Sequence, residues 1–327
     1  MPDNFRFLSR SLTAVAQIAI YLLVLATLLT ACGTLTEPPG APANVPESTM
    51  QSIALIDGRG REVVLSAPAQ RVVSLAPSNT EILFAIGAGN QVVGRDEFSD
   101  YPPDALNVSS VGNTFGKLNE EAIVALEPDL VLVSDLNSPE QVASLEEIGL
   151  TSFVLPNPTD FEGLYRNLET VGMLTGRRDQ TRDLADQLRA RVDRVVQRIQ
   201  GTNPVTVYYE VDSSDPNAPW TTGADTFHDV LIQLAGGTNV ASDITGWGQI
   251  SLEELIARDP EVMIFGEGPF VPTTPDLVAA RPGWGSITAV ANNAVYAVDT
   301  NLVDRPGPRL VDALERIAAL LHPEAFN

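Results

Sequence analysis

The sequence predicts an α/β fold: two similar α/β lobes that one long backbone helix joins. Three observations predict it, namely strand-like apolar runs alternating with helical patterns, an internal repeat, and a long uninterrupted amphipathic segment between the repeats. The chain has 327 residues, enough for two domains of roughly 100–200 residues each. Its apolar content of 44% is high enough to fill hydrophobic cores.

The first lobe is predicted over residues 51–157. Its first 15 positions contain two short apolar runs around Asp57 and Gly58, which is the pattern of a β-hairpin. Strands then alternate with helices, which indicates α/β layers. In chain order the pattern gives a strand at residues 71–75, a helix at 80–86 that ends at Gly87, and a strand at 92–94.

An internal repeat indicates that a second, similar lobe follows over residues 204–327. Residues 119–131 match residues 251–263, 132 positions later. Each copy begins with a helix N-cap residue followed by acidic residues, and continues into an apolar face, a proline and a buried strand. A second match, between residues 81–90 and 229–238, occurs in the same order along the chain at an offset of 148. The different offsets indicate loops of different length in the two copies.

The segment of residues 158–203 between the lobes has apolar residues at helical spacing. Gly172 and Gly176 are candidate breaks that divide it into two helices. No Gly or Pro interrupts residues 177–200, so we expect one long helix to join the lobes and to permit only small lobe movements.

The first 31 residues have the pattern of a signal peptide. Arg6 and Arg10 precede an apolar run at residues 12–29. The run ends in small residues before Cys32, the only cysteine, and this resembles the lipobox of bacterial lipoproteins. The resemblance implies cleavage after residue 31 and acylation of Cys32, with enough acyl chains for stable anchoring. The alternative is a transmembrane anchor with an incidental cysteine.

Residues 32–50 are rich in Pro, Thr, Ala and Glu and lack an apolar period, so they form a predicted flexible tether. The folded part then faces the outside of the cytoplasmic membrane, either in a periplasm or at the cell surface.

Composition excludes several classes of function. With 42 acidic and 20 basic side chains, the formal net charge is −22, which excludes a general nucleic-acid binder. One cysteine and two histidines exclude a disulfide framework and a His-rich metal cage, and no metal site is predicted. An extracytoplasmic hydrolase is disfavoured, because the chain has no Gly-x-Ser-x-Gly motif and neither histidine has a marked nucleophile partner.

From about residue 71 to its end, the chain resembles the helical-backbone substrate-binding proteins of ABC importers, which carry iron–siderophores, haem or cobalamin. Within that group it looks most like the vitamin B12-binding proteins. The wider resemblance is carried by residues 71–81, 119–131, 281–284 and 294–298; the closer one by the Ser-Asp-Tyr-Pro-Pro motif at 99–103 and by residues 218–223 and 247–253.

The resemblance implies a ligand cleft between the lobes, and a corrinoid would need aromatic walls there. Four aromatic residues match wall positions of the cobalamin binders, and the 132-residue offset pairs two of them, Phe115 and Trp247. The alternative is that they are core aromatics, and Trp284 is predicted to be structural. The four predicted wall residues are Phe98, Phe115, Trp220 and Trp247.

Arg305 matches a cleft arginine of the cobalamin binders and would donate to ligand oxygens. Its alternative is a surface ion pair with Asp304. Arg309 is predicted to be structural, and Asn79 and Thr80 are predicted to cap a helix rather than to bind ligand.

Glu121 and Glu253 match the exposed glutamates, one per lobe, through which the family docks on a permease dimer. The repeat places both in the first turn of a helix, where a carboxylate is favoured in any case. Their neighbours Glu120 and Glu254 are alternatives for the same role.

These resemblances imply a lipid-anchored monomer that does no covalent chemistry, needs no cofactor of its own, and hands a corrinoid to an ABC permease. An iron chelate or haem is the alternative cargo. Haem would require an axial ligand to its iron, for which Tyr208, Tyr209 and His228 are candidates. An anionic ferric siderophore would require more basic residues than Lys117 and Arg305. A sensor that reports ligand state to a membrane partner also remains open.

Overall fold

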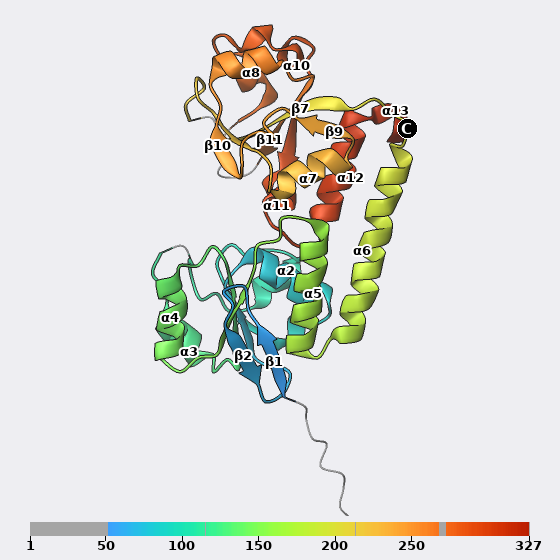
Figure 1. Ribbon diagram of the computed structural model, residues 1–327. Coiled ribbons are helices and arrows are strands. Elements are labelled where there is room, and N and C mark those ends of the chain that lie inside the picture. Colours follow the sequence, from blue (N-terminus) through green and yellow to red (C-terminus); the bar gives the residue numbers. More distant parts are fainter. Residues whose placement is uncertain (1–51, 115, 213, 268–272, 327) are drawn as a thin grey trace, which may run out of the picture. The chain divides into compact units, whose positions relative to one another are not determined.

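The computed structural model describes residues 52–114, 116–212, 214–267 and 273–326, which belong to the compact unit Gln51–Asn327 (Figure 1). The predicted signal peptide, the tether and Cys32 lie outside the described residues, and so does Phe115. Within the described residues, no helix has both the length and the apolar character needed to cross a membrane.

The first lobe is built on a four-stranded, fully parallel sheet. The strands at Leu130–Ser134 and Ser152–Leu155 are buried along almost their whole length, which explains their largely apolar sequences. The strands lie in the order β4 (Val92–Arg95), β3 (Val72–Ser74), β5 (Leu130–Ser134) and β6 (Ser152–Leu155). The lobe also contains the helices α2 (Pro77–Ala85), α3 (Glu120–Ala125) and α4 (Pro139–Glu147) and the 3-10 turns η1 (Gly89–Gln91) and η2 (Pro103–Asn107).

The predicted hairpin is present as the antiparallel strands β1 (Ile53–Ile56) and β2 (Glu62–Leu65). The turn between them closes part of the free edge of β6, because Val154 O accepts a hydrogen bond from Gly58 N at 2.7 Å. Val154 N donates in return to the Asp57 carboxylate at 3.3 Å. Burial acts to raise the pKa of Asp57, but hydrogen bonds from Arg61, Arg59 and Val154 outweigh it and lower the pKa.

The second lobe is built on a six-stranded sheet in which four strands are parallel. Two antiparallel strands form a ribbon that pairs with the carboxyl-terminal part of β7. The parallel strands are β9 (Gly237–Asn239), β7 (Val205–Asp212), β11 (Val262–Glu267) and β12 (Val295–Asp299), and the ribbon is β8 (Trp220–Thr222) with β10 (Trp247–Gln249). The helices are α7 (Phe227–Leu234), α8 (Leu252–Arg258), α9 (Pro275–Ala279), α10 (Thr288–Ala291), α11 (Thr300–Val303), α12 (Leu310–Leu321) and α13 (Pro323–Phe326), with a 3-10 turn η3 (Trp284–Ser286).

The two lobes share one strand order. In the first lobe the parallel strands lie as β4-β3-β5-β6, and in the second as β9-β7-β11-β12. The repeat extends to backbone conformation, because Glu127 and Asp259, again 132 residues apart, both have a positive φ (45° and 41°) where α3 and α8 end. The sequence repeat therefore reflects a repeated strand–helix architecture.

The repeat also extends to hydrogen bonds at the start of the central strands. Asp129, before β5, accepts from the backbone amides of Gln70 and Arg71 at 2.8 and 3.0 Å. Glu261, before β11, accepts from the backbone amide of Thr206 at 2.9 Å. In both lobes an acidic side chain therefore ties the start of the central strand to its neighbour.

Two helices connect the lobes, α5 (Phe161–Thr175) and α6 (Arg178–Arg198). Gly176 breaks the helical segment in a left-handed conformation, with φ 72°. The expectation that Gly172 also breaks it is wrong, because this residue lies inside α5. A Cβ at Gly172 would lie 2.1 Å from Thr181 Oγ1, so glycine is needed there for the close approach of α5 and α6.

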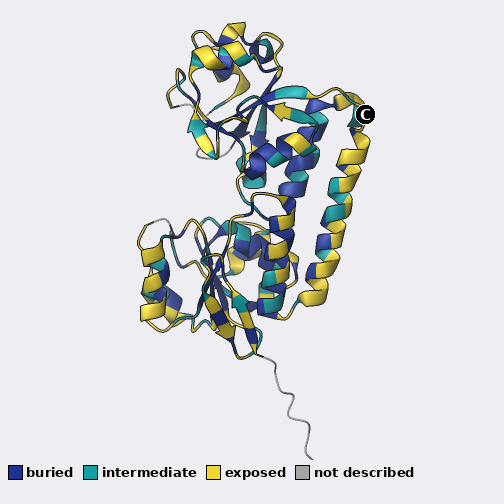
Figure 2. Ribbon diagram, in the orientation of Figure 1, coloured by how far each residue is buried: buried dark blue, intermediate teal, exposed yellow. Residues whose placement is uncertain are grey.

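The long helix α6 is amphipathic, with exposed residues along one side and buried ones along the other (Figure 2). It packs against α5 and against α12 of the second lobe. Arg191 on α6 donates to Asp312 and Glu315 on α12 at 2.5 to 2.9 Å. One cluster of buried apolar residues includes members from both sheets and from α5, α6 and α12, so the two lobes share part of their core.

Candidate ligand-binding and docking sites

The predicted ligand residues that the structure describes follow, or pair with, the carboxyl ends of parallel strands. Phe98 follows β4, Arg305 follows β12 and α11, and the ribbon that carries Trp220 and Trp247 pairs with the end of β7. In open α/β sheets, ligands bind beyond the carboxyl ends of the strands. Both sheets therefore contribute candidate residues from the expected edge.

Trp220 and Trp247 lie on the same face of the β8–β10 ribbon. Trp220 is opposite Gln249 and Trp247 is opposite Thr222, so the two indoles are diagonal neighbours across the strand pair. Their exposed fractions are 42% and 49%, so neither is a core residue. The structure thus brings together two aromatic residues that the sequence analysis had treated separately. By contrast, Trp284 is fully buried and donates to Pro216 O, as predicted for a structural residue.

Glycines explain why these residues form a tight ribbon. A Cβ at Gly223 would lie 2.0 Å from the carbonyl oxygen of Ile244, which no other residue can tolerate without a shift of the backbone. Gly223 N donates to Gly246 O, and Gly246 has a φ of 72°. Gly223 and Gly246 are therefore required by the backbone path that holds the ribbon together.

Of the two predicted aromatic wall residues of the first lobe, the structure describes only one. Phe98 is half-buried in the loop after β4. Phe115 lies outside the described residues, so its pairing with Trp247 across a cleft stays a prediction. Leu136, which was not singled out from sequence, is a further exposed apolar side chain beyond the carboxyl end of a strand, since it follows β5 and is 72% exposed.

Arg305 does not pair with Asp304, which instead accepts from His228 Nε2 at 2.9 Å. Arg305 Nη1 lies 2.5 Å from Asp100 Oδ1 and 3.7 Å from Glu81 Oε1, both in the first lobe. The alternative of an ion pair between Arg305 and Asp304 is therefore wrong. Arg305 instead pairs with an acid of the first lobe and so links the two lobes.

Arg309 is held by the same buried acid. Its guanidinium donates to both carboxylate oxygens of Glu81, at 2.9 and 2.5 Å, and lies 3.8 Å from the ring centroid of Tyr101. Burial acts to lower the pKa of Arg309, but Glu81 outweighs it and raises the pKa. Burial also raises the pKa of Glu81 despite Arg309 and Arg305, so its ionised form depends on arginines of the other lobe.

Asn79 and Thr80 do not cap α2, contrary to the expectation from sequence. The N-cap position is Ala76, which makes no side-chain cap, with Pro77 in the first turn. Asn79 Nδ2 donates to Val133 O at 3.1 Å, and Thr80 Oγ1 donates to Ser99 Oγ at 2.8 Å. Both side chains are buried and tie α2 to the sheet and to the loop after β4.

Asp96, also in the loop after β4, is 1% exposed, and its two carboxylate oxygens lack a hydrogen-bond partner at ordinary distance among the described residues. Burial raises its pKa, although nearby Ser99 and Arg305 oppose the shift. It lines a cavity of about 20 Å³ together with Thr114, Ser134 and Asn137. This volume suits a single water molecule, so the cavity is no site for a large ligand.

Glu121 and Glu253 occupy equivalent, exposed positions in the first turns of α3 and α8. Within the described parts of the chain, neither side chain has a hydrogen-bond or ion-pair partner. Glu254 differs, because Arg258 Nη2 donates to it at 2.5 Å. The structure therefore leaves Glu253 rather than Glu254 available for a partner protein, whereas in the first lobe both Glu120 and Glu121 remain available.

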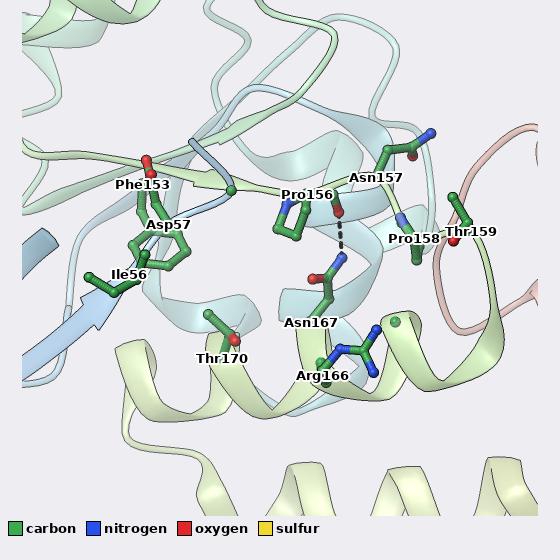
Figure 3. A pocket seen from close by; sticks show the side chains of 12 residues that line it. Ile56, Asp57, Phe153, Pro156, Asn157, Pro158, Thr159, Arg166, Asn167 and Thr170 are labelled. Atoms are coloured by element: carbon green, nitrogen blue, oxygen red, sulfur yellow. Dashed lines mark hydrogen bonds between the residues drawn. The ribbon is translucent and has the colours of Figure 1, made fainter. Parts of the chain in front are cut away.

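A cavity of about 280 Å³ opens beside the hairpin, between the end of β6 and the start of α5 (Figure 3). Asn167 points toward Pro156 and donates to its carbonyl oxygen at 2.8 Å, while Arg166 extends alongside. Sites for drug-sized ligands measure about 300–1,000 Å³, so this cavity is too small to enclose a macrocycle. Among the described residues, no group of three or more His, Cys, Asp or Glu side chains could hold a metal ion.

Comparison with known proteins places this architecture in a family. The model of the periplasmic binding protein family matches residues 72–302, and the chain belongs to that family. It is 30% identical over 312 residues to an uncharacterized ABC transporter substrate-binding lipoprotein, YvrC of Bacillus subtilis, covering 94% of this chain and 96% of that protein. It is also 30% identical over 294 residues to a cobalamin-binding protein of Halobacterium salinarum, covering 88% and 78% of the two chains. The chain is thus a substrate-binding protein of the ABC transporter type.

Solved structures agree on the fold but differ in ligand. The vitamin B12-binding protein BtuF of Vibrio cholerae has a TM-score of 0.66 at 27% identity, covering 80% of this chain and 99% of that chain. The haem-binding protein RhuT of Roseiflexus sp. RS-1 has a TM-score of 0.70 at 28% identity, covering 79% and 99%. The two-lobed α/β fold and the family predicted from sequence are therefore confirmed, whereas both kinds of ligand occur among similar proteins.

Proposed function

We propose that this chain is a lipid-anchored, extracytoplasmic protein that binds cobalamin or a related corrinoid and delivers it to an ABC permease. The observation that carries the proposal is the exposed pair of Trp220 and Trp247 on one face of the β8–β10 ribbon. Two neighbouring indoles offer the flat apolar area that a macrocycle needs, beside a polar sheet edge that can orient its amides. The similarity to a cobalamin-binding protein supports the same cargo.

Haem is the alternative cargo, and the described residues support it less well. Tyr208, Tyr209 and His228, the axial ligands suggested by the sequence, are at most 4% exposed. His228 stacks on Phe227 and donates to Asp304 through Nε2, which keeps its ring inside the second lobe. Coordination of a haem iron by any of the three would require the second lobe to repack.

A ferric siderophore is also less well supported. An anionic chelate needs cationic side chains without internal partners. Arg305 is paired with Asp100, and Arg309 with Glu81, which leaves Lys117 as the remaining cation that the sequence analysis named.

Delivery requires an anchor and a docking surface. We infer that Cys32 carries the lipid, which the name of the Bacillus subtilis relative supports. We infer that Glu121 and Glu253 contact the permease dimer, one per lobe. In this proposal the chain acts as a monomer, uses no resident cofactor and catalyses no reaction. The Cys32→Ser variant should leave the membrane fraction and lose the mass of the lipid in mass spectrometry.

The binding proposal is tested by titrating the full chain in detergent with cyanocobalamin, haemin and a ferric siderophore, with tryptophan fluorescence and calorimetry as readouts. We expect saturable binding of cyanocobalamin, lost by at least about tenfold in a Trp220→Ala/Trp247→Ala double variant, since each buried aromatic pair contributes on the order of 1 kcal/mol beyond its area. Leu277→Ala, which shortens an exposed apolar side chain on α9, is the matched control. Saturation by haemin alone would overturn the choice of cargo.

A further inference from the structure

The charges around Arg305 bear on the chemical class of the ligand. One terminal nitrogen of the Arg305 guanidinium, Nη1, donates to Asp100 Oδ1 at 2.5 Å. Its Nε and Nη2 have no hydrogen-bond partner among the described residues, and its side chain retains an exposed fraction of 15%. The arginine therefore still offers N–H donors while its positive charge is balanced by a neighbouring carboxylate.

The surrounding side chains do not restore a positive charge. Glu81 is occupied by both nitrogens of Arg309, and it lies 3.7 Å from Arg305 as well. Asp96 is close enough to Arg305 for their charges to interact. Two arginines thus face three carboxylates, of Glu81, Asp96 and Asp100, so this part of the lobe junction carries no excess of positive charge.

We propose that Asp100 is a positioning and specificity residue: it holds Arg305 in place and cancels its charge, so that the site accepts uncharged oxygen acceptors such as amide carbonyls and disfavours carboxylates. An arginine donating to an amide oxygen needs fixed geometry, which the Asp100 contact supplies across the lobes. A ligand carboxylate at the same nitrogens would meet the like charge of Asp100. This inference rests on the proposed function, because it assumes that Arg305 faces the ligand.

The test compares two ligands that differ in one charge, cyanocobalamin and a monocarboxylic acid made from it by hydrolysing one peripheral amide. Calorimetric affinities of the full chain in detergent give their ratio. Asp100→Asn should weaken cyanocobalamin binding and shift the ratio toward the acid by about fivefold or more, roughly 1 kcal/mol. Asp100→Glu, which keeps the charge, should preserve the preference for the amide.

The matched control is Asp104→Asn, which removes an exposed carboxylate from the 3-10 turn η2 that follows Asp100; this carboxylate has no partner among the described residues. It should leave both affinities and their ratio unchanged. An unchanged ratio in Asp100→Asn, with normal cobalamin binding in the wild type, would overturn this inference alone. Failure of the wild-type chain to bind either corrinoid would overturn the proposed function and this inference with it.

Discussion

The two lobes repeat one architecture but differ in what is added to it. Both have four parallel strands in the same order, a capped helix before the central strand, and an acid that ties that strand to its neighbour. Only the second lobe, within the described residues, adds a ribbon to its sheet, and the ribbon carries two exposed tryptophans. The shared frame therefore carries the docking role that we propose for both lobes, and the addition carries the ligand-binding role that we propose for the second lobe.

The lobes also differ in how they satisfy an equivalent buried acid. Glu81 on α2 and Asp229 on α7 match in the second sequence repeat, and both are buried. Asp229 is satisfied inside its own lobe, by Asn239 and Gln233 at 2.9 and 2.6 Å. Glu81 is satisfied by Arg309 of the other lobe. The buried acid of the first lobe thus depends on an arginine of the second lobe, whereas the buried acid of the second lobe has its hydrogen-bond donors within its own lobe.

The largest expected effect tests the symmetric part of the comparison. Reversing both Glu121 and Glu253 to Arg should abolish transport of radiolabelled cobalamin by cells, because both of the proposed contacts with permease cations then become repulsive. Cobalamin affinity of the full chain should be unchanged, since the two side chains have no partners within the described protein. Each single reversal should reduce transport partially and to a similar extent.

The matched control for that experiment reverses two other exposed acids in first turns of helices, Glu140 on α4 and Asp276 on α9. Transport should survive this change, although it alters the net charge equally. An equal loss in both double variants would show that overall charge, rather than the equivalent pair, governs delivery. A loss of ligand affinity on reversing Glu121 and Glu253 would assign them to the ligand site instead.

The second prediction separates the two buried acids. Glu81→Ala leaves the guanidinium of Arg309 buried without its partner and should lower the free energy of unfolding by about 3–5 kcal/mol. Asp229→Ala removes only hydrogen bonds from two amides and should cost about 1–3 kcal/mol. Urea denaturation of the full chain in detergent measures both values. If Asp229→Ala proved the more costly, the dependence of the first lobe on the second would be refuted.

The third prediction concerns the β8–β10 ribbon, which within the described residues only the second lobe adds to its main sheet. Gly223→Ala places a Cβ against the Ile244 carbonyl, so the backbone after β8 must shift, and we expect the shift to change the arrangement of the two indoles. Cobalamin affinity should fall by about tenfold or more, which is 1.4 kcal/mol. Gly285→Ala, where a Cβ would meet open space, is the control and should bind normally. Wild-type affinity in Gly223→Ala would argue that the ribbon geometry is not used.

Sequence reasoning reached the elements that depend on local pattern. The lobe repeat, the hairpin at Asp57 and the amphipathic α6 follow from periodicity and turn residues, and the structure contains all three. It failed where contacts between residues distant in sequence determine the partner of a side chain. Arg305 has a neighbouring acid in sequence, Asp304, yet its partner is Asp100, 205 positions away. No local signal distinguishes these two carboxylates.

The same limit explains two other errors. Gly172 and Gly176 are alike in sequence, but only the second lies at a helix end, and the first is fixed by the contact of α5 with Thr181. Asn79 and Thr80 stand where cap residues are common, but Pro77 already starts the helix, so their side chains turn into the sheet instead. In each case long-range packing overrides a valid local preference.

The smallest expected effect distinguishes the lobes by pH. In the second lobe the buried carboxylates Glu210 and Asp229 each accept a hydrogen bond at 2.9 Å, whereas Asp96 in the first lobe has no partner at ordinary hydrogen-bond distance among the described residues. Burial raises the pKa of Asp96 above its usual 3.8, so the folded chain binds this proton more tightly than the unfolded chain does. The contribution of Asp96 to stability therefore falls as pH rises from the unfolded pKa through the raised folded one.

Asp96→Asn removes that titration. The free energy of unfolding of the variant, minus that of the wild type, should increase with pH across this window and level off above it, as measured by urea denaturation of the full chain at a series of pH values. Asp104→Asn, an exposed neighbour, should give a difference that does not change with pH. A difference for Asp96→Asn that is constant, or that falls with pH, would mean that the carboxylate finds a donor in the folded chain, and the two lobes would then satisfy their buried acids equally well.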